Sequence, residues 1–247
     1  MSSLTKTELL LYRNILYVCM VDEKTSEIKT KTVKTNTESN SQETSTESVT
    51  GNKKIHFNGR IEAISGCMFA GKTGELLRRV RRAEIAGYDV TVISPQRDDR
   101  YGDYCIGSHD GEKLEATVIP ENEEGIEQLY TEAQSTDVIA IDEFNFFTEE
   151  FVPVLDDIAN DGVKVIVSGL DQTFRGEPFD PLGSLLTIAD DVTKLTAVCD
   201  ICGREATRTQ RLIDGDPAPE NSPTVQVGGS ESYQARCRDC HTVPSDE

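Results

Sequence analysis

Short apolar runs alternate with stretches of helical periodicity in the middle of the chain. The runs Val90–Ile93, Asp137–Ile141 and Val163–Val167 predict strands buried on both faces, because a strand covered on both sides has few polar positions. Apolar residues three or four positions apart predict a helix that ends at Gly87, and a second helix is predicted over Asp156–Gly162. Strands that alternate with helices predict an α/β fold, with a parallel sheet that binds ligands at the carboxyl ends of its strands.

The N-terminal part of the chain has a different pattern. Residues 25–50 are mostly Ser, Thr, Lys, Glu and Asn, and their only apolar residues are Ile28, Val33 and Val49. Such a segment cannot bury enough apolar surface to offset its loss of conformational entropy, so residues 1–57 are predicted to be a disordered, low-complexity extension. The apolar run Leu9–Val21 is too short and too interrupted to span a bilayer, and no membrane association is expected.

The strongest motif lies in residues 61–73, IEAISGCMFAGKT. A short apolar strand leads into Gly66-x-x-x-x-Gly71-Lys72-Thr73 and a helical pattern follows, which is the arrangement of a Walker A phosphate loop. The glycines let successive backbone N–H groups point inward, and the helix N-terminus adds positive charge, so the loop can hold phosphate oxygens. Lys72 is expected to contact the terminal phosphates, and Thr73 is expected to ligate Mg²⁺.

A pair of carboxylates follows the predicted strand that ends at Ile141. Asp142 lies where nucleoside triphosphatases keep the Walker B carboxylate, so we expect it to hold Mg²⁺ directly or through water. Glu143 comes next and can act as a general base. In an ATPase this base would activate water, and in a kinase it would accept the proton of the acceptor hydroxyl.

Four of the seven cysteines form two Cys-x-x-Cys pairs, Cys199 with Cys202 and Cys237 with Cys240. Four thiolates can hold a structural Zn²⁺, and reduced cysteines with this spacing indicate a cytoplasmic protein. His241 is an alternative to Cys240 as the fourth ligand. The residues between the pairs, Gly203–Arg236, show little periodicity, so they predict a long loop whose base is fixed by zinc.

The charge of the chain is unevenly distributed. There are 25 Lys and Arg against 44 Asp and Glu, a formal net charge of −19, and residues 58–247 alone carry 17 basic and 37 acidic residues, or −20. This excess of carboxylates repels nucleic acid and anionic membranes and is typical of halophilic proteins, so we expect a halophile's enzyme that binds no nucleic acid. The cluster Arg78, Arg79, Arg81 and Arg82 is expected on a solvated or subunit-facing side of its helix.

Several of these stretches, taken together, also follow the order and spacing of a known family. They are GCMFAGKT at 66–73, DDRY at 98–101, SHD at 108–110, DEFNFF at 142–147, GLDQTFRGEPF at 169–179, KLTAVCDIC at 194–202 and VQVGGSESYQARCRDC at 225–240. This set resembles the thymidine kinases of the zinc-lasso type over about residues 60–243. The resemblance implies transfer of the γ-phosphate of ATP to the 5′-hydroxyl of thymidine or deoxyuridine in nucleoside salvage, by a homotetramer with thymidine triphosphate as a feedback inhibitor.

The resemblance also implies domains and site residues. Residues 58–191 would form a RecA-like P-loop kinase domain, and residues 192–247 a small zinc-binding lasso domain that closes over the nucleoside. The implied ATP-binding residues are Gly66, Cys67, Met68, Phe69, Ala70, Gly71, Lys72, Thr73, Asp98, Asp99, Arg100, Asp142, Glu143, Phe144 and Asn145. The implied nucleoside-binding residues are Met68, Leu170, Phe174, Phe179, Thr224, Val225, Gln226, Val227, Gly228 and Tyr233. Glu143 would be the catalytic base, assisted by Arg100 and Lys72.

Two details qualify this picture. The family commonly has Gln where this chain has Asn145, and the shorter amide is expected to make the same contact. Because the metal cysteines and the phosphate loop fall in different predicted domains, removing zinc is expected to free residues 224–233 and to leave the phosphate loop intact.

Two other functions fit part of the pattern. A RecA-like ATPase acting on DNA would use the same Walker residues, with arginines near the cysteines as the DNA contact, but the charge of residues 58–247 counts against it. These arginines are Arg204, Arg208, Arg211, Arg236 and Arg238. A non-catalytic nucleotide sensor would not need Glu143 or an intact phosphate loop, and this chain has both.

Overall fold

The computed structural model describes residues 59–96, 105–107, 113–225 and 229–245. All of them belong to one compact unit, Lys53–Glu247. The extension predicted for residues 1–57 lies outside the described residues, as do Asp98, Asp99, Arg100, Gln226, Val227 and Gly228. Among the described residues, no helix is long and apolar enough to cross a membrane.

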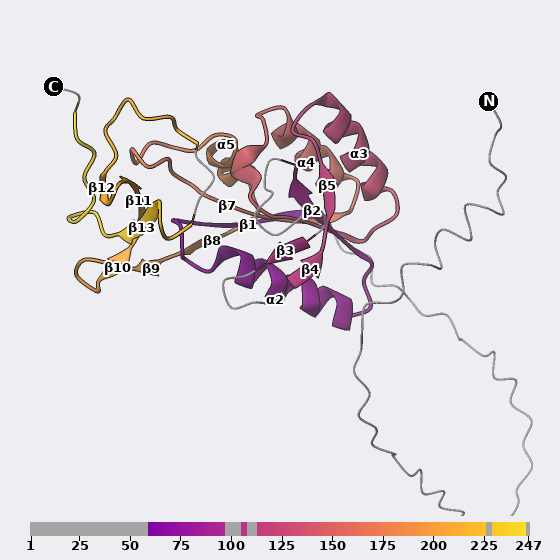
Figure 1. Ribbon diagram of the computed structural model, residues 1–247. Helices are drawn as coiled ribbons and strands as arrows, with labels where there is room; N and C mark the ends of the chain where they lie inside the picture. The colour runs from indigo at the N-terminus through magenta and orange to yellow at the C-terminus, as the bar shows by residue number, and fades with distance from the viewer. Residues whose placement is uncertain (1–58, 97–104, 108–112, 226–228, 246–247) are drawn as a thin grey trace, which may run out of the picture. The chain divides into compact units, whose positions relative to one another are not determined.

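A six-stranded parallel sheet forms the centre of this unit (Figure 1). Its strands, in spatial order, are β5 (Thr117–Ile119), β2 (Val90–Pro95), β6 (Val138–Ile141), β7 (Lys164–Gly169), β1 (Arg60–Gly66) and β8 (Asp191–Leu195). Every neighbouring pair is parallel. The predicted α/β fold is therefore confirmed. Because the strands are parallel, the carboxyl ends of β6, β7 and β1 lie side by side at the same end of the sheet.

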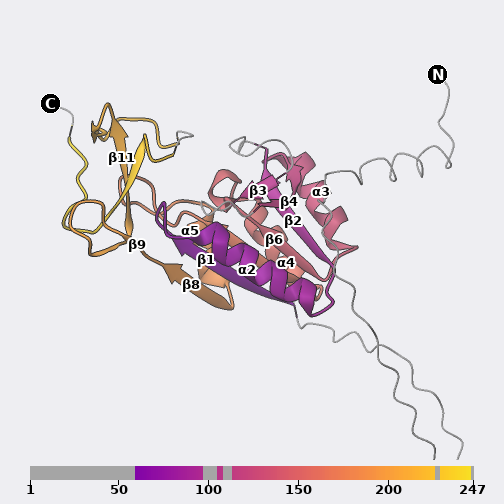
Figure 2. The ribbon, with the colours of Figure 1, turned by 60° about the horizontal axis from the view of Figure 1, so that its bottom comes forward.

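The alternation of side chains along the buried strands creates two apolar cores. Ile139 and Ile141 of β6 pack on the side of α3 (Glu123–Ala133), α4 (Phe151–Asn160) and α5 (Leu182–Ile188). Val138 and Ala140 pack on the side of α2 (Lys72–Ile85). Figure 1 shows α2 on one face of the sheet and α3 and α4 on the other, and Figure 2 brings α2 forward over β1.

The helix predicted over Asp156–Gly162 begins earlier than expected, because α4 starts at Phe151. Its apolar face continues through Val152, Leu155 and Ile158, all of which are buried. Pro153 is tolerated there because its missing N–H falls in the first turn, where it would have no partner within the helix. The apolar spacing therefore supports a helix that starts before the proline.

The C-terminal residues form a small lobe of short antiparallel strands. β9 (Ala197–Val198) pairs with β10 (Glu205–Ala206), and β11 (Arg208–Ile213) lies between β12 (Asp216–Pro217) and β13 (Tyr233–Arg236). Another hairpin, β3 (Cys105–Gly107) with β4 (Lys113–Glu115), lies elsewhere in the chain. Both views show the lobe at the end of the sheet toward which β1 runs (Figures 1 and 2).

The prediction of a loop over residues 203–236 is thus partly wrong, because this stretch contains the paired strands β11 and β13. The burial of β11 does not follow an apolar pattern, because Thr209, Gln210 and Arg211 are consecutive buried polar residues. Gln210 of β11 is fully buried, and its side-chain amide makes two hydrogen bonds with the backbone of Thr242, at 2.8 and 2.9 Å. Polar side chains satisfied in this way hide the alternation by which a strand is recognised.

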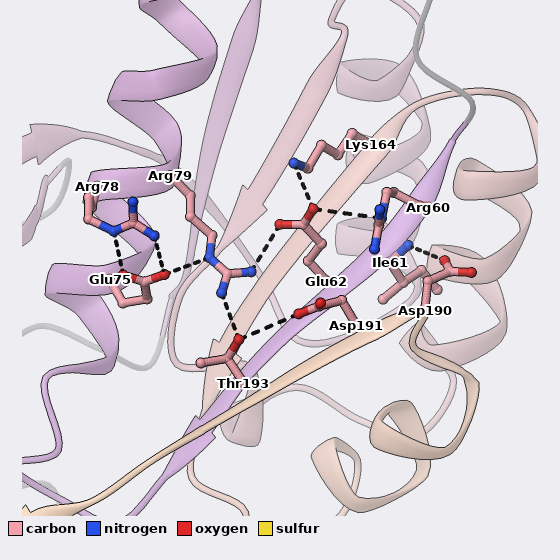
Figure 3. A network of polar contacts seen from close by, with 10 residues as sticks. All are labelled: Arg60, Ile61, Glu62, Glu75, Arg78, Arg79, Lys164, Asp190, Asp191 and Thr193. Carbon is pink, nitrogen blue, oxygen red and sulfur yellow. Dashed lines mark hydrogen bonds and ion pairs between the residues drawn. The ribbon is translucent and has the colours of Figure 1, made fainter.

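Two of the clustered arginines on α2 belong to an ion-pair network near the start of β1 (Figure 3). Glu62 of β1 pairs with Arg79 at 2.9 Å and with Lys164 at 2.8 Å, and Glu75 pairs with Arg78 at 2.6 Å and with Arg79 at 2.9 Å. Burial acts to raise the pKa of Glu62, but Lys164 and Arg79 together hold it below its ordinary value. Arg79 therefore packs onto the sheet, whereas Arg78, Arg81 and Arg82 are exposed, as expected for a solvated or subunit-facing side of the helix.

The acidic surface predicts that stability depends on salt. The melting temperature should rise from about 0.1 M toward molar KCl, because salt screens repulsion among surface carboxylates. Salt also weakens the attraction within the ion pairs of the Glu62 network, which lowers stability, but this effect is small because partly buried pairs are screened less. Thermal unfolding followed by circular dichroism in a KCl series tests this, with an equally concentrated sucrose series as a control for nonionic stabilisation. Full stability in dilute buffer would contradict the halophilic interpretation.

Candidate active site

The phosphate loop joins β1 to α2 through a backbone that requires glycine at two positions. Gly66 has φ 150°, and a Cβ added there would lie 2.6 Å from the carbonyl oxygen of Leu195 in β8. Gly71 has φ 82° and caps the start of α2. The loop therefore leads directly onto the N-terminus of a helix, where backbone N–H groups and the helix dipole favour phosphate oxygens. The structure has the strand, loop and helix that the Walker A spacing predicts.

Lys72, Thr73 and Asp142 come together at the end of the sheet. Lys72 is buried, and its Nζ donates a hydrogen bond to the carbonyl oxygen of Cys67 at 3.0 Å. Thr73 Oγ1 donates to Asp142 Oδ2 at 2.8 Å, so the first turn of α2 contacts the residue that follows β6. A hydroxyl and a carboxylate at this distance offer the oxygen ligands that Mg²⁺ prefers.

Ser168, near the end of β7, is a further partner of Asp142 that the sequence did not single out. Its hydroxyl donates to Asp142 Oδ1, so both carboxylate oxygens are held. Burial, and next the charge of Glu143, raise the pKa of Asp142, while the hydrogen bonds from Ser168 and Thr73 act in the opposite direction. The sequence signal for Ser168 was its position as a polar residue directly after three apolar residues of a predicted strand.

Glu143 has an unusual backbone. Its φ of 50° and ψ of 42° lie in the left-handed region, which residues other than glycine rarely adopt. It immediately precedes a single 3₁₀ turn, η1 (Phe144–Phe146), and its side chain is half-buried. Backbone strain of this kind is concentrated at functional sites, so the geometry supports a role for the Glu143 side chain.

Asn145 connects the two segments that follow β6 and β7. Its Oδ1 accepts a hydrogen bond from the backbone N–H of Leu170 at 2.9 Å. The approach is close enough that a Cβ on Gly169 would lie 3.1 Å from the same oxygen. The amide of Asn145 therefore positions Leu170, one of the residues implied to bind the nucleoside.

The aromatic side chain of Phe174 is buried beneath two arginines. The guanidinium carbon of Arg175 lies 4.5 Å from the centroid of the Phe174 ring, and that of Arg211 lies 5.6 Å from it. Cations over a ring face are attracted by its negative charge density. Phe174 is 3% exposed, whereas Thr224 and Val225 are exposed, and Tyr233 is buried in β13.

Arg175 also holds residues 220–224. Its Nε donates to the carbonyl oxygen of Glu220 at 2.7 Å, its Nη2 to that of Ser222 at 2.5 Å, and its Nη1 to Thr224 Oγ1 at 2.9 Å. Arg211 adds a hydrogen bond to the carbonyl oxygen of Pro223. These contacts fix the segment just before Val225 to the residues around Phe174.

The four predicted metal ligands form a cluster. The Sγ atoms of Cys199, Cys202, Cys237 and Cys240 all lie within 4.8 Å of one another. Cys202 Sγ and Cys237 Sγ are 3.6 Å apart. A tetrahedral site with Zn–S bonds of about 2.3 Å has edges of roughly 3.8 Å, so the cysteines fit Zn²⁺. His241 is not a member, since its Nε2 hydrogen-bonds to the carbonyl oxygen of Phe174 at 2.8 Å.

Arg204 favours the thiolate form of Cys202. Its Nε lies 3.4 Å from Cys202 Sγ, and its Nη2 lies 3.6 Å from Cys237 Sγ. The hydrogen bond from Arg204 is the main cause of a lowered pKa at Cys202. Deprotonated thiols are the form that binds zinc.

Comparison with known proteins identifies the family of this chain. The sequence model described as thymidine kinase matches residues 59–241. Thymidine kinases from two strains of Halobacterium salinarum are 53% identical over 186 residues, which cover 75% of this chain and 95% of theirs. The thymidine kinase of Haloquadratum walsbyi is 47% identical in an alignment 221 residues long, and the match covers 77% of this chain and 98% of its own.

A solved DNA replication initiation factor covers 56% of this chain and 40% of its own at 16% identity, with a TM-score of 0.35, too low to bear on fold or function. The named relatives come from halophilic archaea, which agrees with the halophilic character predicted from the charge. The family match over most of the chain and these identities show that the chain belongs to the thymidine kinase family.

Proposed function

We propose that this nucleoside kinase transfers the γ-phosphate of ATP to the 5′-hydroxyl of thymidine or deoxyuridine. The observation that carries the proposal is the 2.8 Å contact between Thr73 Oγ1 and Asp142 Oδ2, with Glu143 next in the chain. It brings the phosphate loop, which follows β1, against the candidate magnesium carboxylate and candidate base, which follow β6. Family membership supports the thymidine kinase class.

In this proposal the phosphates of ATP lie along the loop from Gly66 to Thr73. The ammonium of Lys72 exchanges its contact with the Cys67 carbonyl for the terminal phosphates. Thr73 and Asp142 would hold Mg²⁺, which would neutralise part of the charge on the phosphates. Ser168 orients Asp142 through its second oxygen.

Glu143 acts as the general base. It accepts the proton of the 5′-hydroxyl as the new O–P bond forms, and the bond between the γ-phosphorus and the bridging oxygen breaks to release ADP. Arg100, which lies outside the described residues together with Asp98 and Asp99, is assigned to the developing charge on the transferred group. Phe144 and Asn145, which the resemblance assigns to ATP, are both buried: Phe144 lies in the apolar core and Asn145 contacts Leu170.

The nucleoside is assigned to the residues after β7 and to the lasso. Asn145 positions Leu170. Arg175 fixes residues 220–224 beside Phe174, and these residues directly precede the segment assigned to the nucleoside, which continues through Gln226, Val227 and Gly228. A segment that closes over the acceptor excludes water and aligns the hydroxyl with the γ-phosphate. Phe179 and Tyr233 complete the assigned pocket, together with Met68.

The remaining expectations stay proposals. They are the domain boundaries at residues 57 and 191, a homotetramer, feedback inhibition by thymidine triphosphate, a resident Zn²⁺ and a cytoplasmic location. β8, Asp191–Leu195, pairs with β1 in the central sheet, so the strand lies across the second boundary.

The arginines near the cysteines give little support to the alternative of a DNA-dependent ATPase, because most of them contact other residues of the chain. Arg204 contacts two of the thiols and Asp239, and Arg208 contacts Gln172. Arg211 and Arg236 hydrogen-bond to the carbonyl oxygens of Pro223 and Cys240. Side chains engaged in this way are less available to phosphates of DNA.

A panel of nucleosides tests the proposed function. The full chain, in KCl and Mg²⁺ with ATP, should produce monophosphate from thymidine, from deoxyuridine or from both, and ADP in equal amount. Cytidine, adenosine and guanosine serve as controls and should give no product. ATP hydrolysis that depends on added DNA, with no thymidine monophosphate formed, would replace the kinase proposal by the ATPase alternative.

A further inference from the structure

A lysine of β8 pairs with a buried carboxylate that follows β7. Lys194 Nζ lies 2.6 Å from Asp171 Oδ2, and the side chain of Asp171 is 5% exposed, whereas that of Lys194 is 48% exposed. Both carboxylate oxygens are buried, and among the residues that the structure describes no other group hydrogen-bonds to them. Lys194 therefore supplies the charge that compensates Asp171.

The ion pair reaches across the end of β1. β7, β1 and β8 are consecutive strands of the central sheet (Figure 1). Ser65 of β1 is aligned with Gly169 of β7 on one side and with Lys194 of β8 on the other. β7 and β8 are thus two strand spacings apart, roughly 10 Å, so only a long side chain can connect them across the strand that leads into the phosphate loop.

Asp171 also closes the base of a turn formed by residues 171–179. The backbone N–H of Phe179 donates to the carbonyl oxygen of Asp171 at 3.0 Å. The turn carries Phe174 and ends at Phe179, two of the residues assigned to the nucleoside. The position of its base therefore sets where both rings lie.

The buried charge of Asp171 makes the turn depend on Lys194. A buried carboxylate without a cation or hydrogen bonds is strongly unfavourable, and removal of one partner of a buried pair leaves such a charge. Asp171 can escape this cost only by moving toward water, and its backbone then moves the base of the turn. The phosphate loop is held separately, because it is joined to β1 and α2.

We propose that Lys194 is a positioning residue for the nucleoside pocket, which holds Asp171 and with it the turn 171–179 against the sheet. This inference rests on the proposed function, since it takes Phe174 and Phe179 to bind the nucleoside. Lys194 accordingly acts on thymidine affinity and not on ATP affinity.

The test compares thymidine and ATP constants in the full chain. Lys194→Met keeps the length of the side chain but removes its charge. It should raise the KM for thymidine, and the Kd of thymidine measured by calorimetry, about 10- to 100-fold, the effect of a small displacement of positioned groups. The KM for ATP should stay within about twofold, because the turn contains no residue of the phosphate loop. Lys194→Arg keeps both charge and reach and should stay within about threefold of the unaltered chain for thymidine.

Asp171→Asn distinguishes a stranded charge from lost packing. It removes the buried charge itself, so the rise in the KM for thymidine should be smaller, about three- to tenfold. Without the carboxylate the lysine has nothing to compensate, so Asp171→Asn combined with Lys194→Met should match Asp171→Asn alone. Additive losses in this double variant, or equal losses for ATP and thymidine, would show general support of the fold and overturn the positioning role.

Arg82→Met is a matched control, since it removes one positive charge from an exposed position of α2 and introduces the same side chain. It should change neither constant. Zinc content and melting temperature are measured for each variant, and Lys194→Gln replaces the methionine variant if that variant does not fold.

Phe174→Ala separates this inference from the proposed function. If Phe174→Ala loses thymidine affinity while Lys194→Met binds thymidine normally, the pocket is assigned correctly and the role of Lys194 is overturned. If both variants bind thymidine normally, the assignment of the pocket is wrong and the inference falls with it. Loss of thymidine affinity in both, with ATP affinity retained, supports the two proposals together.

Discussion

Glu143→Gln should lower kcat by about two to four orders of magnitude and leave binding of an ATP analogue nearly unchanged. A positioned general base contributes about 10²–10⁴ to rate, and glutamine keeps the size of the side chain but cannot accept the proton. Single-turnover phosphorylation of thymidine, combined with calorimetry of the analogue, measures the two effects separately.

Glu149→Gln is the control for this change. Glu149 is exposed and its Oε1 accepts a hydrogen bond from Ser184 at 3.2 Å, which an amide oxygen can also accept. This variant removes one negative charge from the same segment and should retain normal turnover. Near-normal turnover in Glu143→Gln would remove Glu143 from the mechanism.

Lys72→Ala should weaken both ATP binding and turnover, each by about 10- to 100-fold, the usual worth of hydrogen bonds to charged groups. Its ammonium contacts the phosphates in the bound state and in the transition state, so both are affected. Loss of its contact with the Cys67 carbonyl adds little, because that acceptor belongs to the loop itself. Equilibrium binding of the analogue and steady-state kinetics with thymidine test this prediction.

Arg82→Ala removes a positive charge from the exposed side of the same helix and provides the comparison. It should leave ATP binding unchanged, since exposed charges at this distance are screened by salt. A loss confined to thymidine affinity in Lys72→Ala would mean that the nucleotide and nucleoside sites have been assigned the wrong way round.

Local spacing was sufficient to single out the residues of the candidate site. A Walker A loop has its glycines, lysine and threonine within eight consecutive residues, and Asp142 follows its strand directly, so both could be identified without the fold. The two cysteine pairs were equally clear, and the structure brings their four sulfur atoms together. The alternation of apolar runs also predicted the parallel sheet, because burial on both faces leaves a local signature.

The partners of these residues were decided by the tertiary structure. Ser168 meets Asp142 because β6 and β7 become neighbours, and β11 escaped prediction because most of its buried residues are polar. The expectation that zinc loss would spare the phosphate loop stays a prediction, and the apolar cluster that Cys67 shares with Cys199 and Cys237 counts against it. Periodicity reports how each segment is buried, but which distant segments meet depends on strand order and packing. Thr209 and Met68, 141 residues apart, became partners only through the fold.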